Sequence, residues 1–285
     1  MKNVKIRLGG VPEHFNLPIH LAKEQGVFSS RGVDLEWTDF GGGTGQMTKA
    51  LRENEVDACI LLTEGMIKDI IKGSPCKIIS EYVTTPLTWG IHTGVNNELM
   101  NYRDIFTKQY AISRFGSGSH LMAIVDADSK GYRLEKDQFT IIKDINGALP
   151  SLDNLETDVF YWEKYTTKPY VDAGQLRRIG EYNTPWPCFV IAASGEFIKN
   201  EEDTLKTILE IINTTTEEFK SIPSIDKTIA NRYEQQLEDV QEWLSATEWS
   251  QSLIDKATVT QVQKTLLSLN IIDRTVDYSE LVHKL

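Results

Sequence analysis

Apolar and polar residues alternate along the first part of the chain in blocks that predict strands and helices in turn. The period-two run over residues 4–8 predicts a strand, and apolar residues at helical spacing over 17–27 predict a helix closed by Gly26. The pattern continues with expected strands at 33–37, 57–62 and 76–83 and expected helices at 46–54 and 64–72. Such a series predicts a mostly parallel sheet with helices on both faces.

Two irregular stretches divide the rest of the chain. Residues 84–93 and 183–188 contain proline without any helical period, and we interpret both as crossings between two domains. Between them we expect strands at 110–113, 139–142, 158–162 and 176–179 and helices at 118–129, 147–152 and 163–173. After Glu196 the pattern is helical, and we expect helices at 201–220, 225–232, 240–246 and 258–269 to cover the first domain.

Composition narrows the class of protein. A length of 285 residues with 40% hydrophobic content is typical of a globular protein of two domains. The net charge of -11 argues against nucleic acid or an anionic membrane as the main partner. Three scattered cysteines indicate neither a disulfide framework nor a zinc site, and we expect no metal. No apolar run is long enough to span a bilayer.

Two glycine-rich loops carry the candidate chemistry. Residues 113–123 follow a short apolar run and precede an amphipathic one, so Ser117, Gly118 and Ser119 are expected between a strand and a helix. Backbone N–H groups and hydroxyls at a helix start bind small anions. Residues 40–46, with four glycines and Thr44, have the same construction, and we expect the two loops to face each other across a cleft.

Several motifs resemble those of one known family. They are Gly9–Pro18, Ala22, Gly26–Phe28, Gly32–Val33, Gly41–Gly45, the step from Leu51 to Asp57, and Gly116–His120. Together they resemble the periplasmic-binding-protein type II family, in particular the nitrate, sulfonate and taurine substrate-binding proteins and the similar thiamine-pyrimidine synthases. The resemblance covers residues 5–198.

The resemblance implies an α/β fold of two lobes, each a βα-built sheet flanked by helices, joined by two crossovers and closing on a ligand by a hinge. Lobe one would be residues 1–88 plus 188–285, and lobe two residues 89–187. The implied ligand-binding residues lie after predicted strands, where open α/β sheets bind ligands. They are His14, Phe15, Asn16, Gly43, Thr44, Thr63, Glu64, Ser117, Gly118, Ser119, Trp162 and Trp186.

Structural alternatives stay open for most of these residues. His14 and Phe15 could belong to an ordinary loop, and Gly43 to a tight turn without ligand contact. Trp162 and Trp186 could be stacking groups or core residues. Glu64 is most simply an acid that stabilises a helix start.

The sequence also bears on catalysis. It has no HExxH, GxSxG or Walker loop and no complete GxGxxG, and we assign no catalytic residue and no cofactor. The cysteine-rich iron-binding segment of the thiamine-pyrimidine synthases is absent. An enzyme of thiamine-pyrimidine or menaquinone biosynthesis on the same fold is the alternative, with His14 or Glu13 as its candidate proton-transfer group.

We therefore expect a solute-binding protein for a small polar or anionic ligand, related to ABC importers and with an ABC permease as its candidate partner. The chain opens with Met1, Lys2 and Asn3 and then a strand-like run, without an apolar signal core. As the sequence stands we expect a cytoplasmic protein. The alternative is a periplasmic or lipid-anchored protein whose signal has been removed.

Overall fold

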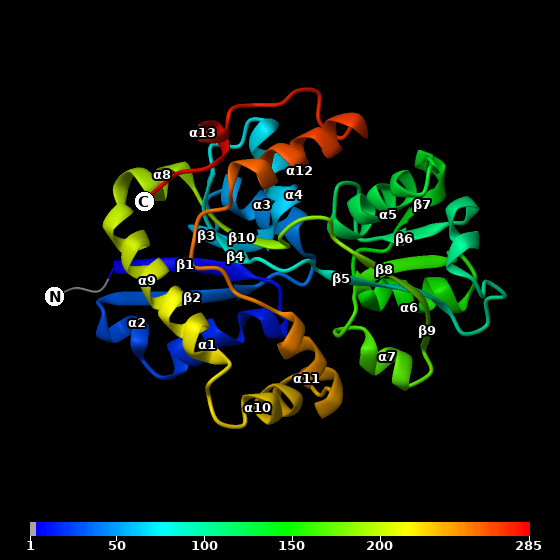
Figure 1. Ribbon diagram of the computed structural model, residues 1–285, viewed down its shortest axis with the longest axis horizontal. Helices are drawn as coiled ribbons and strands as arrows, with labels where there is room; N and C mark the ends of the chain where they lie inside the picture. Colours follow the sequence, from blue (N-terminus) through cyan, green and yellow to red (C-terminus); the bar gives the residue numbers. More distant parts are fainter. Residues whose placement is uncertain (1–3) are drawn as a thin grey trace. The chain divides into compact units, whose positions relative to one another are not determined.

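The computed structural model describes residues 4–285 as an α/β protein with two five-stranded sheets. The chain divides into two compact units (Figure 1). Lobe two is the continuous segment Pro86–Pro185, and lobe one holds the segments that end at Thr85 and begin at Trp186. The predicted fold class, a sheet with flanking helices in each lobe, is confirmed. Residues Met1 to Asn3, which were part of the argument about export, lie outside the described residues.

The sheet of lobe one has the strand order β2-β1-β3-β10-β4. Its strands are β1 (Val4–Gly10), β2 (Val33–Asp39), β3 (Ala58–Leu62), β4 (Lys77–Val83) and β10 (Phe189–Ala193). β1 is parallel to β2 and β3, whereas β10 is antiparallel to β3 and β4. Every residue of β3 is buried, which explains why its sequence is a continuous apolar run rather than an alternating one.

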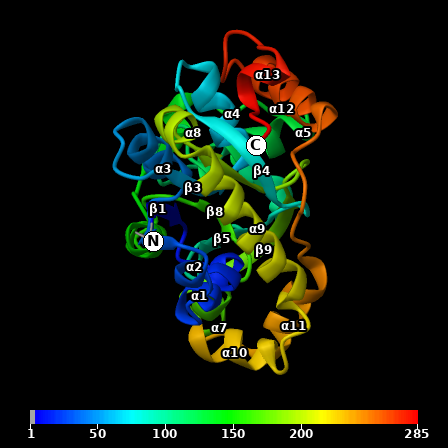
Figure 2. The same cartoon turned by 90° about the vertical axis from the view of Figure 1, so that its left-hand side faces the viewer.

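Helices cover both faces of this sheet. They are η1 (His14–Asn16), α1 (Leu17–Glu24), α2 (Val27–Ser30), α3 (Thr44–Arg52), α4 (Thr63–Ile71), α8 (Gly195–Asn200), α9 (Glu202–Phe219), α10 (Ile225–Arg232), α11 (Leu237–Ala246), α12 (Lys256–Ser268) and α13 (Tyr278–Leu281). In Figure 1, α1 and α2 lie on one side of β1 and β2, and α3, α4 and α12 lie on the other. Figure 2 shows α10 and α11 at one end of lobe one and α12 and α13 at the other, beside α4.

The sheet of lobe two has the order β7-β6-β8-β5-β9. Its strands are β5 (Thr88–Gly94), β6 (Tyr110–Ile112), β7 (Phe139–Ile141), β8 (Val159–Glu163) and β9 (Leu176–Asn183), and its helices are η2 (Tyr102–Thr107), α5 (Gly118–Ser129), η3 (Lys136–Gln138), α6 (Ile145–Asp153) and α7 (Lys168–Asp172). α6 and α7 pack on one face through a core that includes Leu152, Phe160 and Tyr170. α5 lies on the opposite side of the sheet in Figure 1.

Four sequence-based expectations are wrong. Thr88–Gly94 was expected to be irregular but forms β5, between β8 and β9. Gly90 is needed there for packing rather than for a turn, because a Cβ would lie 2.4 Å from the His92 ring. The sheets are mixed rather than mostly parallel, since β5 and β10 are antiparallel to both neighbours.

The other two corrections concern helices. The helix expected over 163–173 shrinks to α7, because the Glu163 carboxylate accepts from the Thr166 N–H at 2.6 Å and holds a turn there. The helix expected over 17–27 is two helices, because Gly26 has a left-handed φ of 73°.

Candidate functional site

The loop before α5 in lobe two is built largely by its own side chains. Ser117 is the N-cap of α5, and its Oγ accepts from the His120 N–H at 3.4 Å. The Ser119 Oγ accepts from the Ser113 N–H at 3.2 Å and lies 3.0 Å from the Ser117 Oγ. All three serines are buried. The cap leaves the N–H groups of Gly118 and Ser119, the first two helical residues, without an intrahelical acceptor, as at any helix start.

Arg114 adds a positive charge to this loop. Its Nη1 atom is buried without a hydrogen-bond partner, and no acidic side chain of the described residues pairs with it. Burial lowers the pKa of its guanidinium from the ordinary value of 12.5. The loop thus carries a cation whose natural counterpart is an anionic group from outside the chain. Sequence reasoning missed this role, although an arginine beside a Ser-Gly-Ser helix start was the available signal.

In lobe one, the carboxyl end of β3 carries a buried acid. Glu64, in the first turn of α4, is fully buried, and its Oε2 accepts from the Trp186 Nε1 at 2.9 Å. Its Oε1 has no partner. Burial raises the pKa of the Glu64 carboxyl, and the indole hydrogen bond opposes that shift. Trp186 is therefore a buried hydrogen-bond donor, which neither of its predicted roles included.

Two threonines lie beside this acid. The Thr44 Oγ1 accepts from the Leu62 N–H at 3.2 Å, and its methyl group fills the space that a Cβ on Gly65 would need. Thr63 donates through its hydroxyl to the Pro187 carbonyl at 2.7 Å. The structure thus brings Thr44, Thr63, Glu64 and Trp186 together at the carboxyl end of β3, with Thr44 and Thr63 partly used in holding the backbone.

The predicted triplet after β1 is buried. His14 lies 4.1 Å from Trp243 and 5.1 Å from Phe15, measured between ring centroids, and Trp243 also contacts Phe15. These rings form an aromatic cluster with Tyr233. Asn16 donates through Nδ2 to the Val11 carbonyl at 2.8 Å, and its Oδ1 is buried without a partner. This oxygen of Asn16 is therefore able to accept a further hydrogen bond.

Gly43 and Trp162 have structural roles of their own. Gly43 is the N-cap of α3 with φ 69° and ψ -160°, a conformation reserved for glycine. Trp162 is stacked on Phe160 and packs against the core under α6 and α7. Neighbouring Tyr161 points to the opposite face and bonds Asp126 on α5. Trp162 is therefore not grouped with the serine loop at the start of α5.

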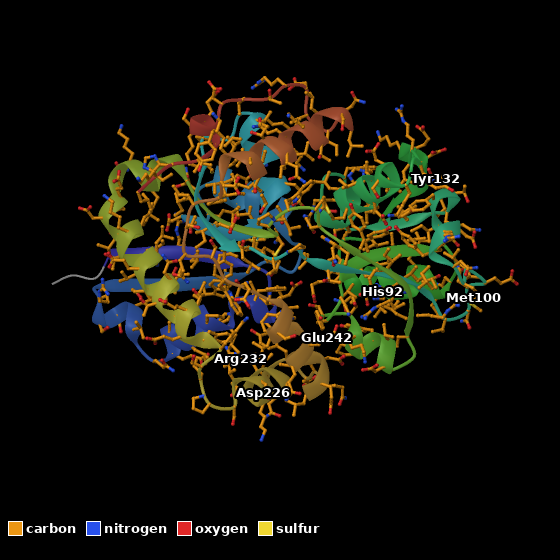
Figure 3. All side chains as sticks on the ribbon, in the orientation of Figure 1. His92, Met100, Tyr132, Asp226, Arg232 and Glu242 are labelled. Atoms are coloured by element: carbon orange, nitrogen blue, oxygen red, sulfur yellow. The ribbon has the colours of Figure 1, made fainter. Side chains whose placement is uncertain are left out.

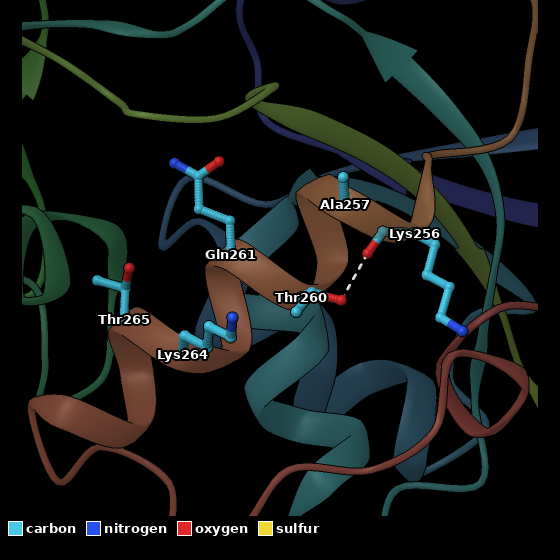
Figure 4. Close-up of a pocket in the computed structure, with 6 residues that line it drawn as sticks. All are labelled: Lys256, Ala257, Thr260, Gln261, Lys264 and Thr265. Atoms are coloured by element: carbon cyan, nitrogen blue, oxygen red, sulfur yellow. Dashed lines mark hydrogen bonds between the residues drawn. The ribbon is translucent and has the colours of Figure 1, made fainter.

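The surface of lobe one also has a hollow along α12, away from the strand ends. It has a volume of about 750 Å³ and is lined by Lys256, Ala257, Thr260, Gln261, Lys264 and Thr265 (Figure 4). The Thr260 hydroxyl is already used, since it donates to the Lys256 carbonyl at 2.7 Å. Because the lysines are exposed and the hollow follows a helix rather than a strand end, we assign it no ligand.

Residues 4–285 offer neither a metal site nor a membrane-spanning helix. No group of three or more His, Cys, Asp or Glu side chains is placed there to hold a metal ion. None of the helices in that range is long and apolar enough to cross a bilayer. In Figure 3, Met100 and Tyr132, which are 67% and 48% exposed, lie toward the margin of lobe two, and buried His92 lies among its strands.

Comparison with known proteins gives a family model that matches part of the chain and a common fold over nearly all of it. The model of the Ca3427-like periplasmic binding proteins matches residues 89–182. The CA3427 gene product of Candida albicans defines a family with the generic periplasmic binding protein fold. Its sequence is 26% identical to that of this chain, and the two structures match with a TM-score of 0.91 over 99% of this chain and 96% of that chain. A search of curated proteins gives no match.

Two sulfonate-binding proteins have the same fold. The alkanesulfonate-binding protein SsuA from Xanthomonas axonopodis pv. citri, bound to MOPS, is 14% identical with a TM-score of 0.82, and the match covers all of both chains. The aliphatic sulphonate binding protein SsuA from Escherichia coli is 14% identical with a TM-score of 0.74, over 98% of this chain and 97% of that chain. The chain therefore has the two-lobe periplasmic-binding-protein fold, as the sequence resemblance implied.

Proposed function

We propose that the protein is a solute-binding protein that closes on a small polar ligand and holds an anionic or carbonyl group of it at the loop before α5. One observation carries the proposal. The half-buried guanidinium of Arg114, without an acidic partner, lies in the same loop as the first N–H groups of α5. A buried cation is costly unless it is paired, and helix starts favour negative charge, so an anionic ligand group satisfies both.

Two of the structures of similar fold support this choice of ligand chemistry. Both are sulfonate-binding proteins, and a sulfonate is a compact anion with three acceptor oxygens. The Ser117 and Ser119 hydroxyls lie 3.0 Å apart, so one donates to the other and one hydroxyl hydrogen remains for a ligand. That hydroxyl, two backbone N–H groups and a guanidinium form a suitable donor set for such a group.

The binding test uses the purified chain and a panel of ethanesulfonate, taurine, nitrate and pyrimidines. We expect at least one member to raise the melting temperature and to bind in calorimetry without being converted. Arg114→Gln is expected to weaken binding of an anionic member at least tenfold, because the charge-assisted hydrogen bonds are lost. The same variant should melt at the same or a higher temperature, since it removes a desolvated charge.

Arg133→Gln is the matched control. Arg133 is an arginine of lobe two whose side chain is 82% exposed, and it lies 3.5 Å from the Glu135 carboxylate. Binding within twofold of the parent is expected. Turnover of any panel member would replace the proposal with the enzyme alternative. Equal binding of the anionic ligand by the Arg114→Gln variant and the parent would contradict the role proposed for Arg114.

Transport is a further part of the proposal. A binding protein of an ABC importer delivers its ligand to a permease outside the inner membrane, whereas a cytoplasmic binding protein does not. Fractionation of the native cells, together with uptake of the identified ligand in cells with and without the gene, tests this part. A cytoplasmic location with unchanged uptake would exclude the importer role and leave the ligand-binding proposal in place.

A further inference from the structure

Several buried oxygen atoms in lobe one lack hydrogen-bond partners, and two of them belong to fully buried residues that follow strands of the sheet. These two atoms are Oε1 of Glu64 and Oδ1 of Asn16, and both residues are 0% exposed. Leaving a buried acceptor unbonded costs about 1–3 kcal/mol, so each such atom calls for a physical explanation. Neither belongs to the anion-binding loop of lobe two, so their chemistry adds to the proposed function.

Both atoms lie at the same edge of one sheet. Asn16 follows β1, and Glu64 follows β3 directly. These strands are parallel neighbours, with Leu8 paired to Ala58, so their carboxyl ends lie at one edge. Open α/β sheets bind ligands at that edge.

The neighbouring groups fix which atoms stay available. The Trp186 indole N–H occupies Oε2 of Glu64 at 2.9 Å, which leaves Oε1 for another partner. The Asn16 amide nitrogen donates to the Val11 carbonyl at 2.8 Å, so the Asn16 amide oxygen is the atom that remains available. An amide oxygen only accepts hydrogen bonds, and a carboxyl oxygen does the same when the group is ionised. A ligand N–H bonded to Glu64 favours that ionised form and so opposes the effect of burial on its pKa. The chemistry shared by the two atoms is therefore acceptance from a donor.

We propose that this edge of lobe one recognises a nitrogen-bearing end of the ligand, the N–H groups of an amine, an amidine or an aminopyrimidine, with Glu64 as the principal acceptor and Asn16 as the second. The inference rests on the proposed binding function and narrows its ligand class. Added to the anionic or carbonyl group of the proposed function, it selects a ligand that also carries nitrogen donors. Trp186 is a positioning residue, since it holds the carboxyl of Glu64.

The test compares matched probes on the full chain by titration calorimetry. Taurine and ethanesulfonate differ by one amino group, as do 4-aminopyrimidine and pyrimidine. We expect the amino member of at least one pair to bind at least tenfold more tightly. Glu64→Gln should remove that preference, because the side chain then has a single carbonyl oxygen, and Trp186 already occupies one of the two terminal atoms. Binding of the probe that lacks the amino group should stay within twofold.

Glu81→Gln is the matched control. Glu81 is a buried acid of β4 in the same lobe, with its pKa also raised by burial, and its carboxylate is bonded by Thr84 and Ser250. It should keep the preference for amino probes. Trp186→Phe keeps an aromatic ring but removes the N–H, and we expect it to reduce the preference without abolishing binding.

The outcomes separate the two proposals. Binding without an amino preference in the parent, or an unchanged preference in Glu64→Gln, overturns the nitrogen-recognition inference and leaves the binding function standing. Binding by none of the four probes overturns the inference, whereas the proposed function is overturned only if the whole panel, nitrate included, fails to bind. The probe pairs decide the matter on the parent protein even where the Glu64→Gln variant does not fold.

Discussion

At the scale of single residues, the predicted site divides into groups that hold the backbone and groups that keep an atom for a ligand. The first group includes Thr44, Thr63 and Ser117, whose hydroxyl groups form hydrogen bonds with the backbone of the protein. Arg114 and Glu64 each keep a buried polar atom without a partner. The second group is the better guide to ligand chemistry, because buried polar atoms are nearly always bonded.

Gly43 provides a test of the first group. Its φ of 69° with ψ -160° is accessible to glycine alone, so Gly43→Ala is expected to lower the free energy of unfolding by about 1–3 kcal/mol. Gly41→Ala, two residues earlier, is the control, because a Cβ there meets nothing within 4 Å and φ is not in the left-handed region. Urea denaturation measures both. Equal effects would contradict the strained conformation at Gly43.

Buried His14 makes stability depend on pH. Burial lowers its pKa to about 3 in the folded protein, from 6.5 when unfolded. Between these values the unfolded state binds more protons, so the stabilisation is complete above pH 6.5 and is lost as the pH falls. From pH 7 to pH 5 the parent should lose about 2 kcal/mol more than His14→Phe.

The comparison of parent and variant isolates this histidine. His92, whose pKa burial also lowers to about 3, acts in the same direction but is present in both proteins. Glu64 acts in the opposite direction, because burial raises its pKa, and it too is present in both. Urea denaturation at the two pH values is the measurement. Parallel pH profiles of the parent and His14→Phe would show that His14 is not held neutral.

At the scale of elements, α5 is fastened to the rest of lobe two by a buried acid. Asp126 is 0% exposed and accepts from the Tyr102 hydroxyl at 2.5 Å and the Tyr161 hydroxyl at 2.6 Å. These bonds join α5 to η2 and to β8. Because residues 113–117 lead directly into α5, the same contacts hold that loop against the sheet.

Asp126→Ala should lower the free energy of unfolding by about 2–4 kcal/mol, because both tyrosine hydroxyls then lose their acceptor. Asp128→Ala, at an exposed position of the same helix, should change it by no more than about 0.5 kcal/mol. Urea denaturation of both variants measures the difference. A similar small effect for both variants would mean that the hydrogen bonds between Asp126 and the two tyrosines contribute nothing to the docking of α5.

Sequence patterns predicted these elements unequally well, for physical reasons. α5 and α10 have the predicted ends, residues 118–129 and 225–232. The Ser117 cap marks the start of α5, and apolar spacing indicated α10. β5 was missed because its glycine and threonines resemble a loop, and its strand character comes from pairing with β8 and β9. The carboxyl edges of the strands could be located from the pattern. The unbonded atoms of Arg114 and Glu64 could not, because bonding depends on the neighbours that the fold supplies.

At the scale of the whole molecule, the order of the strands makes lobe one depend on the return of the chain from lobe two. β10 is the strand between β3 and β4, yet it follows lobe two in the sequence. Lobe one therefore cannot complete its sheet until the chain has returned from lobe two. The two ends of each lobe are held together, since the Cys188 N–H donates to the Thr85 carbonyl at 3.3 Å and the Thr184 N–H donates to the Leu87 carbonyl at 3.0 Å.

This arrangement predicts that lobe one folds when lobe two is excised but not when the chain is cut. Replacement of residues 86–185 by a short Gly-Ser linker keeps β10 and α9 to α13 and spans ends that are already adjacent, so a folded domain is expected. A chain that stops after Pro185 has a gap between β3 and β4 and lacks the covering helices, so it should remain unfolded. Amide dispersion in NMR spectra and cooperative urea unfolding distinguish the two. If the excised chain is unfolded as well, lobe one needs lobe two for its stability, and the two units form one cooperative domain.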